Sequence, residues 1–331
     1  MAGVKALRRL QLGKESVPGT PVAATAIWRG LGVLEDQREV QFAEETVGKL
    51  FPPARAFQTK LLAGLEMEET PATFEQLPYV LAASVDGVTI GTQDGTGSDY
   101  IYTYAFPDAS VPLIKTFTIE GGDNQQAEKA EYAFVQAFTL SGESSGVLSV
   151  SATWVARQVT PTTFTSGLSL VNVEEILFGT GKLYIDTPGS IGSTLKSNTL
   201  RGMSFEYQSG IKEKFTIDGL YFAFHQFTQP SFSLQLTFEH DSTAVAEIAA
   251  WRAGTPRAIR LKWEGSSVTT PGSVYSKKTL ILDLYGVWES FEKLSEQDGN
   301  DIVTGTLHCD NNLTAGTAGS IVVVNEVASL P

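Results

Sequence analysis

Residues Ser231–Glu239 read S-F-S-L-Q-L-T-F-E, and this stretch decides the fold class. Every second residue is apolar, namely Phe232, Leu234, Leu236 and Phe238. Successive side chains of a β-strand point to opposite faces, so the alternation predicts a strand with one buried and one solvated face. A strand covered on one side only is typical of antiparallel sheets.

Two further stretches repeat the alternation, Leu148–Trp154 and Ile259–Trp263. Glycine- and serine-rich segments separate the predicted strands at the spacing of hairpins, and these are Gly91–Asp99, Gly142–Gly146 and Thr187–Ser193. The sequence therefore predicts an all-β-dominated fold of antiparallel strands joined by tight turns.

Two segments have the apolar spacing of helices. Thr243–Ala253 has Ser242 or Asp241 as a candidate N-cap, and a glycine and a proline follow as stop signals. Thr73–Ser84 has comparable spacing, but Pro78 would either kink this helix or mark its true first turn.

The order of these elements repeats along the chain. A strand with an acidic end precedes each helix, and the helix starts, Thr73 and Thr243, lie 170 residues apart. Farther on, Tyr132–Gly146 aligns with Tyr285–Gly299 at an offset of 153 residues, and a longer loop in the first copy would account for the difference. We predict a duplicated strand–helix–hairpin unit, with chance matches in an all-β chain as the alternative. The predicted units are residues 1–172 and 173–331.

Composition and charge limit the class of protein. The 331 residues include 24 Lys and Arg against 37 Asp and Glu, giving a net charge of −13. This charge argues against a protein that grips nucleic acid phosphates or coats an anionic membrane. The one cysteine, Cys309, excludes an internal disulfide framework and a cysteine-based zinc site. We find no signal-peptide pattern and no apolar stretch of membrane-spanning length, so we expect neither export nor a membrane span.

No motif predicts catalysis, a cofactor or a metal site. Gly142–Gly146 matches G-x-S-x-G around Ser144, but it lies between two predicted strands, where a hairpin turn is expected. Gly179–Lys182 resembles a phosphate-binding loop that lacks the first glycine, the final hydroxyl residue and a following helix. The histidines have no metal-ligand spacing, and we expect them in packing or at the surface: His225, His240 and His308.

The N-terminal stretch Leu10–Thr25, L-Q-L-G-K-E-S-V-P-G-T-P-V-A-A-T, resembles the opening of tail tube (major tail) proteins of long-tailed bacteriophages. Val135–Gly146 running into Leu148–Trp154 is similar to a hairpin of those proteins, in which an F-T-L-S-G-E strand precedes an S-A-T-W strand. Together with Trp251–Pro256 and Gln297–Thr306, the similarity extends over nearly the whole chain.

The resemblance implies tail-tube β-sandwich units with a flanking α-helix, whose sheets join edge to edge into rings that stack as a hollow tube. Ring closure would also satisfy backbone groups that an exposed sheet edge leaves free. The implied partners are other copies of the chain and the tape measure, tail terminator and distal tail proteins. Double-stranded DNA would pass through without specific binding, and the implied location is the virion tail, assembled in the host cytoplasm.

The sequence leaves the ring order and two competing functions open. Three duplicated chains would form a pseudo-hexamer, whereas six chains would form a homohexamer with the second half as a decoration domain. A non-catalytic module that binds carbohydrate or protein is one competing class, because aromatic residues alternate at Tyr100, Tyr102, Tyr104 and Phe106. A hydrolase acting through Ser144 is the other.

Ring and stacking contacts are expected from long segments without a clean core pattern, since long loops in compact proteins are commonly functional. These segments are Lys14–Leu34, Val47–Gln58 and Asn311–Pro331. The candidate contact residues are Lys14, Glu15, Pro18, Phe51, Pro52, Pro53 and Arg55.

The acidic charge suggests a lining for the tube. A duplex slides through a bore without being held if the bore repels it, so we expect a net negative lumen. The candidate lumen acids interrupt strand-like runs in both halves: Glu66, Glu68, Asp283 and Glu289. The alternative is that the acids lie outside and serve solubility.

Overall fold

The computed structural model describes residues 2–51, 54–106 and 108–331. Strands dominate it, the sheets are antiparallel, and the described residues contain two α-helices, so the predicted all-β class is confirmed. The strands of the first half are β1 (Arg9–Lys14), β2 (Ala26–Trp28), β3 (Gly32–Asp36), β4 (Glu39–Phe42), β5 (Ala56–Lys60), β6 (Ala63–Pro71), β7 (Thr92–Gln93), β8 (Tyr100–Ala105), β9 (Phe117–Gly122), β10 (Ala127–Glu143), β11 (Ser149–Ala156) and β12 (Val159–Thr162). Those of the second half are β13 (Gly181–Asp186), β14 (Leu195–Lys196), β15 (Leu200–Gln208), β16 (Ile211–Lys214), β17 (Phe224–Phe227), β18 (Ser231–Glu239), β19 (Arg257–Ser267), β20 (Lys277–Phe291), β21 (Ser295–Gln297), β22 (Asn300–Cys309) and β23 (Gly319–Asn325).

Both predicted helices form; the first is shorter than predicted, whereas the second has the predicted length and begins one residue earlier. α2 (Ser242–Arg252) begins after Asp241, whose carboxylate accepts hydrogen bonds from the first-turn amides of Thr243 and Ala244. α1 (Leu77–Ala82) has Pro78 in its first turn, where a missing backbone donor costs nothing. Short 3₁₀ turns add Lys5–Leu7 and Phe178–Thr180.

In the first half, the strands pair in the order β3–β6–β11–β10. β10 is long enough to serve two sheets: its N-terminal part pairs with β9 and β12, and β9 pairs in turn with β1. A bulge between Val135 and Ala137 marks the change from one sheet to the other.

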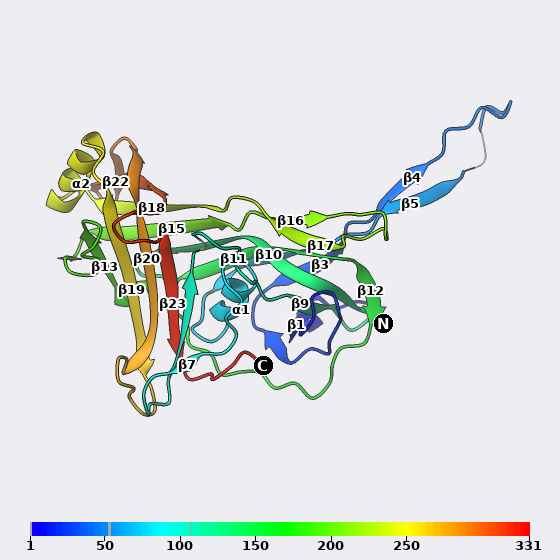
Figure 1. Cartoon of the computed structure of the whole chain (residues 1–331), viewed down its shortest axis with the longest axis horizontal. Coiled ribbons are helices and arrows are strands. Elements are labelled where there is room, and N and C mark those ends of the chain that lie inside the picture. Colours follow the sequence, from blue (N-terminus) through cyan, green and yellow to red (C-terminus); the bar gives the residue numbers. More distant parts are fainter. Residues whose placement is uncertain (1, 52–53, 107) are drawn as a thin grey trace.

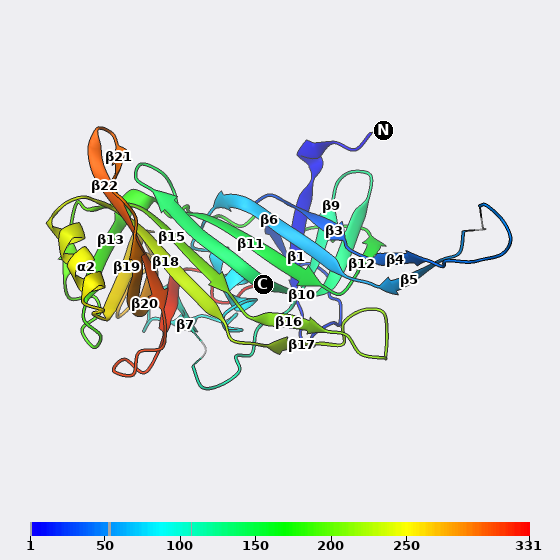
Figure 2. The same ribbon diagram turned by 90° about the horizontal axis from the view of Figure 1, so that it is seen from above.

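In the second half, the strands pair in the order β15–β18–β22–β20. The N-terminal part of β20 pairs with β19 and β23, and β19 pairs with β13. A bulge lies between Trp288 and Ser290 of β20. Figure 1 and Figure 2 show these strands side by side with those of the first half.

Two strand pairs join the halves. β15 pairs with the C-terminal part of β10, and β8 pairs with β23 across the predicted boundary at residues 172 and 173. The apolar faces of the sheets share one hydrophobic core, to which residues from Leu10 to Leu330 contribute. The two halves therefore share sheets and a core and are not separate domains joined by a linker.

Two hairpins extend from this body. β4 and β5 form an arm that projects far from the sheets, and β16 and β17 form a second hairpin that lies across the first half (Figure 1). A small hydrophobic cluster beneath β16–β17 contains Tyr132, Phe134, Ile211 and Phe222.

The C-terminal segment differs from expectation. The sequence suggests contact surface throughout Asn311–Pro331, yet Gly319–Asn325 forms β23 between β20 and β8, and Val323 is fully buried. The run I-V-V-V has no alternation because the strand is largely covered on both faces, which hides it from a period-2 search. The N-terminal segment also folds back, as β2 and β3, with Trp28 buried.

Candidate functional site

A polar sheet face runs across both halves of the chain. In the strand order β3–β6–β11–β10–β15–β18–β22, polar side chains oppose one another in register: Thr139 lies between Ser151 and Glu206, and Glu206 lies opposite Ser233. We call the side of these strands that points away from the core the polar face. Its carboxylates are Glu35, Glu66, Glu68, Glu69, Glu143, Glu206 and Glu239.

Positive charge is scarce on the polar face. The structure describes all of these strands, and only the part of β10 beyond its bulge belongs to the polar face. Within this set, Arg201 is the one Lys or Arg. Arg201 pairs with Glu239 at 3.8 Å and with Asp298. Cations gather instead on the outer side of β13 and β19, at Lys182 and Lys262. Seven carboxylates against one paired guanidinium give the polar face a negative potential.

The β10–β15 junction is reinforced by the second hairpin. Ile211 and Phe222 of β16–β17 pack on Tyr132 and Phe134 of β10. Arg157 of the first half donates hydrogen bonds to the carbonyls of Phe222 and its neighbour at 3.0 and 2.7 Å. A strand pair and a crossing hairpin thus hold the second half of the chain against the first.

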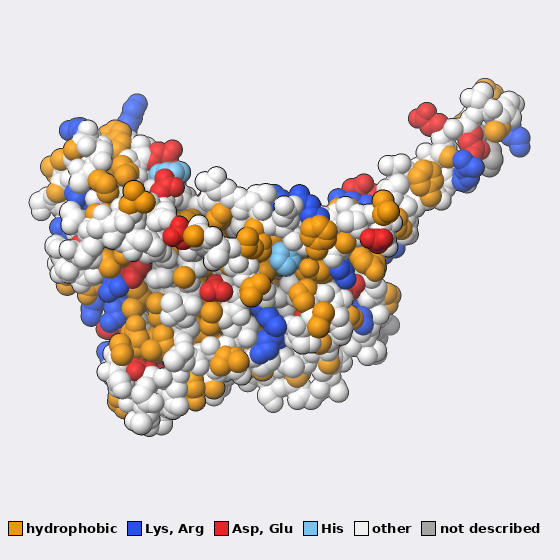
Figure 3. Space-filling model, in the orientation of Figure 1, with side chains coloured by type: hydrophobic (Ala, Val, Ile, Leu, Met, Phe, Trp, Pro, Cys, Tyr) orange, Lys and Arg blue, Asp and Glu red, His pale blue; other side chains and the backbone are white. Residues whose placement is uncertain are grey.

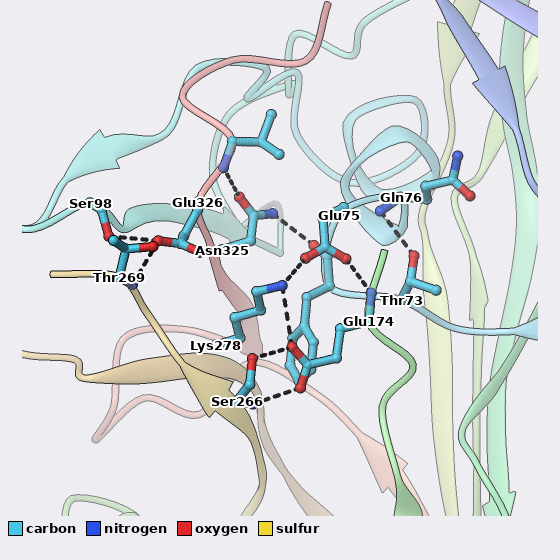
Figure 4. A network of polar contacts seen from close by, with 12 residues as sticks. Thr73, Glu75, Gln76, Ser98, Glu174, Ser266, Thr269, Lys278, Asn325 and Glu326 are labelled. Atoms are coloured by element: carbon cyan, nitrogen blue, oxygen red, sulfur yellow. Dashed lines mark hydrogen bonds and ion pairs between the residues drawn. The ribbon is translucent and has the colours of Figure 1, made fainter. Parts of the chain in front are cut away.

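A partly buried ion-pair network also links the halves (Figure 4). Lys278 Nζ lies 2.7 Å from Glu75 Oε1 and 3.2 Å from Glu174 Oε2, with 15% of the lysine side chain exposed. Burial opposes the charge on Lys278, but the two carboxylates outweigh it and raise the pKa of its ammonium. Burial also opposes charge on Glu174, yet hydrogen bonds from Ser266 and the Lys278 charge hold the pKa of its carboxyl below the usual range.

The same network fixes the end of β23. Asn325 donates through Nδ2 to the carbonyl of Phe74 at 2.7 Å. Glu326 accepts from the Ser98 hydroxyl at 2.7 Å and from the Thr269 amide at 2.8 Å (Figure 4). The C-terminal strand is therefore locked to segments from both halves.

Comparison with known families decides the class. A family model described as phage tail tube protein matches residues 5–325, which is nearly the whole chain. The chain belongs to the phage tail tube protein family. It is a structural component of the virion tail, in a family whose members self-assemble into a tube with other tail proteins. No curated protein matches the sequence.

The four candidate lumen acids of this tail tube protein do not share one surface. Glu66 and Glu68 lie on the polar face, where Glu66 accepts a hydrogen bond from the Thr153 hydroxyl at 2.8 Å. Asp283 lies on the other sheet, paired through both oxygens with Arg260 at 2.7 Å. Glu289 is the extra residue of the β20 bulge.

Sequence reasoning missed five acids on the polar face: Glu35, Glu69, Glu143, Glu206 and Glu239. Glu206 alternates with the buried Phe205 and Tyr207, and this pattern was available in the sequence. Asp283 likewise lies between two buried residues, Leu282 and Leu284, so the local pattern could not show that it belongs to a different sheet.

The candidate ring contacts vary in exposure. Glu15 is 1% exposed, and its carboxylate accepts from the backbone amides of Gly19 and Tyr132 at 2.8 Å and from two threonine hydroxyls. Lys14 donates to the carbonyl of Leu330 at 2.7 Å, and Pro18 is exposed. The G-K-E-S motif therefore organises the N-terminal turn inside its own subunit.

The contacts proposed on the arm are largely exposed. Phe51 is 90% exposed at the arm's tip, where hydrophobic side chains are visible (Figure 3), and Arg55 pairs with Glu45 at 3.1 Å. Pro52 and Pro53 lie outside the described residues.

The motifs tested for catalysis are structural. Gly142–Gly146 is the β10–β11 turn, with Ser145 at φ 70°, so the predicted hairpin is confirmed. Ser144 lines a hollow of about 400 Å³, and the described residues around it include no histidine or carboxylate that could activate a serine. Gly179–Lys182 passes from a 3₁₀ turn into β13 and has no helix behind it.

The aromatic row is core and not a binding surface. Tyr102 and Tyr104 are fully buried and Phe106 is 3% exposed, with the Tyr102 hydroxyl donating to the carbonyl of Val327 at 2.6 Å. In the described ranges, no three His, Cys, Asp or Glu side chains group as metal ligands. No described helix has the length and apolar character that crossing a membrane requires.

Proposed function

We propose that copies of this chain close into rings, that the rings stack into the hollow tail tube, and that the polar face lines its bore. The observation that carries the proposal is the continuity of this face over both halves, with seven carboxylates and one paired arginine. Double-stranded DNA has about one negative charge per 1.7 Å of its axis, so a basic lining would retain it by counterion release. A negative lining repeated around each ring keeps the duplex centred and free to slide.

We propose further that the two units are copies of one plan. Support comes from the strand orders, since β3–β6–β11–β10–β9–β1 in the first half has the counterpart β15–β18–β22–β20–β19–β13 in the second. The bulges support it as well: Val135 and Ala137 lie 153 residues before Trp288 and Ser290, the offset of the sequence repeat.

Three such chains would then form a pseudo-hexameric ring. The alternative is a ring of six chains in which the second half decorates the outside. Both halves contribute strands to one polar face, and this favours three chains. A decoration domain would lie outside the tube and would not extend the lining of the bore.

The remaining partners follow from the tube itself. A tape measure protein would occupy the bore during assembly in the host cytoplasm, and tail terminator and distal tail proteins would cap the two ends. DNA would pass without a specific site, and the proposal requires no cofactor, catalysis or membrane contact.

The charge of the lining is tested by Glu206→Lys, with Asp108→Lys as control. Both residues are exposed and both substitutions change the charge by the same amount, but Asp108 lies in the loop after β8. We expect both variants to form tubes and only Glu206→Lys to slow DNA ejection in a single-phage fluorescence assay, most strongly at low salt. Equal ejection rates would contradict a role for this face in the bore.

A further inference from the structure

We infer that neighbouring copies join by pairing β3 of one copy with Phe291–Ser295 of the next, in the register of the internal β10–β15 junction. This inference rests on the proposed ring and specifies its contact surface. Two sheet edges without strand partners among the described residues, their register and the two hairpins support it.

The internal junction supplies the template. β15 pairs on one side with β18 and on the other with the C-terminal part of β10. β3 is in the corresponding place beside β6, and its second edge has no strand partner among the described residues. On the corresponding edge of β20, pairing with β19 stops at Gly286, and no described strand pairs with that edge farther on.

The 153-residue shift and the matching β3–β6 and β15–β18 registers fix the register between copies. Ser141 of β10 pairs with Ser204 of β15. A shift of 153 residues carries Ser141 to Leu294. The β3–β6 and β15–β18 registers relate Ser204 to Val33 in the same way, since Leu34 pairs with Leu65 as Phe205 pairs with Leu234.

Val33 and Leu294 therefore face each other across the contact. Each is an apolar side chain left about half exposed in the single chain, at 49% and 51%. Burial of both against one another removes apolar surface from water at the point where two backbone edges also become paired. The same register sets Glu35 opposite Glu292, and like charges directly opposite destabilise a strand pair.

The hairpins extend the same template. β16–β17 covers Phe134, whose counterpart at the 153-residue offset is Val287, 36% exposed in the single chain. The arm β4–β5 corresponds to β16–β17 and exposes Val40, Phe42 and Phe57 at 46%, 68% and 48%. The geometry thus directs the apolar base of the arm across Val287 of the next copy.

Cysteine cross-linking of assembled tubes tests the register. Residues directly opposite in an antiparallel pair have Cα atoms about 4.5 to 5.5 Å apart, within the range a disulfide spans. We expect Val33→Cys combined with Leu294→Cys to give covalent oligomers after mild oxidation, ending in a closed ring whose mass gives the number of chains. Burial raises the pKa of the Cys309 thiol, so the native cysteine stays unreactive.

The matched control is Val33→Cys with Val287→Cys. Val287 lies seven residues from Leu294, about 23 Å along an extended strand, so this pair should stay uncross-linked. Hydrogen exchange on unmodified protein gives a second measurement, because the amides of residues 32–36 and 291–295 should exchange more slowly in tubes than in free subunits. Tubes that form without the 33–294 cross-link and without slowed exchange would overturn the inference and leave the proposed function intact. Absence of rings and tubes in micrographs of the wild-type protein would instead contradict the proposed function.

Discussion

Lys278 is charged where little of its side chain reaches solvent, and it lies between carboxylates of Glu75 and Glu174. Removing it leaves Glu75, only 4% exposed, without its counter-charge. We expect Lys278→Met to lower the free energy of unfolding by about 3 kcal/mol in denaturant titrations. Lys277→Met, at the exposed neighbour, should change it by less than about 0.5 kcal/mol. Equal effects of the two substitutions would show that the network adds nothing specific.

The pH dependence of this link has a defined sign. The pKa of Glu174 is lowered in the folded state, so its contribution is complete above the usual value of 4.5 and is lost as pH falls through the lowered pKa. The pKa of Lys278 is raised, so its contribution is complete below 10.5 and is lost as pH rises through the raised pKa. The difference in unfolding free energy between wild type and Glu174→Gln should therefore be constant near neutrality and shrink in acid.

At the scale of elements, the sequence predicted the strands whose apolar and polar residues alternate and the helix that has an N-cap residue. The strand at Ser231–Glu239 and the helix after Asp241 depend on local spacing and on one side-chain oxygen, and both form as expected. β23 was not predicted because its apolar run is buried on both sides. β3 was not predicted because its five residues provide too few alternations. Local spacing could not show that Asp283 lies on a different sheet from Glu66, since only long-range pairing decides which sheet a strand joins.

The β4–β5 arm is the element whose loss should separate folding from assembly. Its described tip residues, Leu50 and Phe51, are 96% and 90% exposed, so they contribute little to the subunit core. Deleting residues 47–58 and closing the arm with a short turn should leave a soluble monomer with unchanged thermal unfolding. Negative-stain micrographs should then show no tubes.

Shortening the other hairpin is the appropriate comparison for that deletion. Replacing the loop between β16 and β17 would disturb Phe222, which is fully buried, so it should lower thermal stability as well. Tubes of normal length from the arm-deleted protein would refute the assignment of the arm to assembly.

At the scale of the whole molecule, the account depends on which surface faces the bore. The sheet β3–β6–β11–β10–β15–β18–β22 is acidic on its polar face, whereas Lys182 and Lys262 lie on the outer side of β13 and β19. A tube built from this chain can present only one of these surfaces to DNA. The choice sets both the charge of the channel and the strands that must meet between subunits.

A cryo-electron microscopy map of the assembled tube tests this claim most directly. The account predicts rings of three chains, a bore lined by the polar face with Glu66 and Glu206 pointing inward, and more acidic than basic side chains along the channel. A bore lined by Lys182 and Lys262, or one with more Lys and Arg than Asp and Glu, would contradict it.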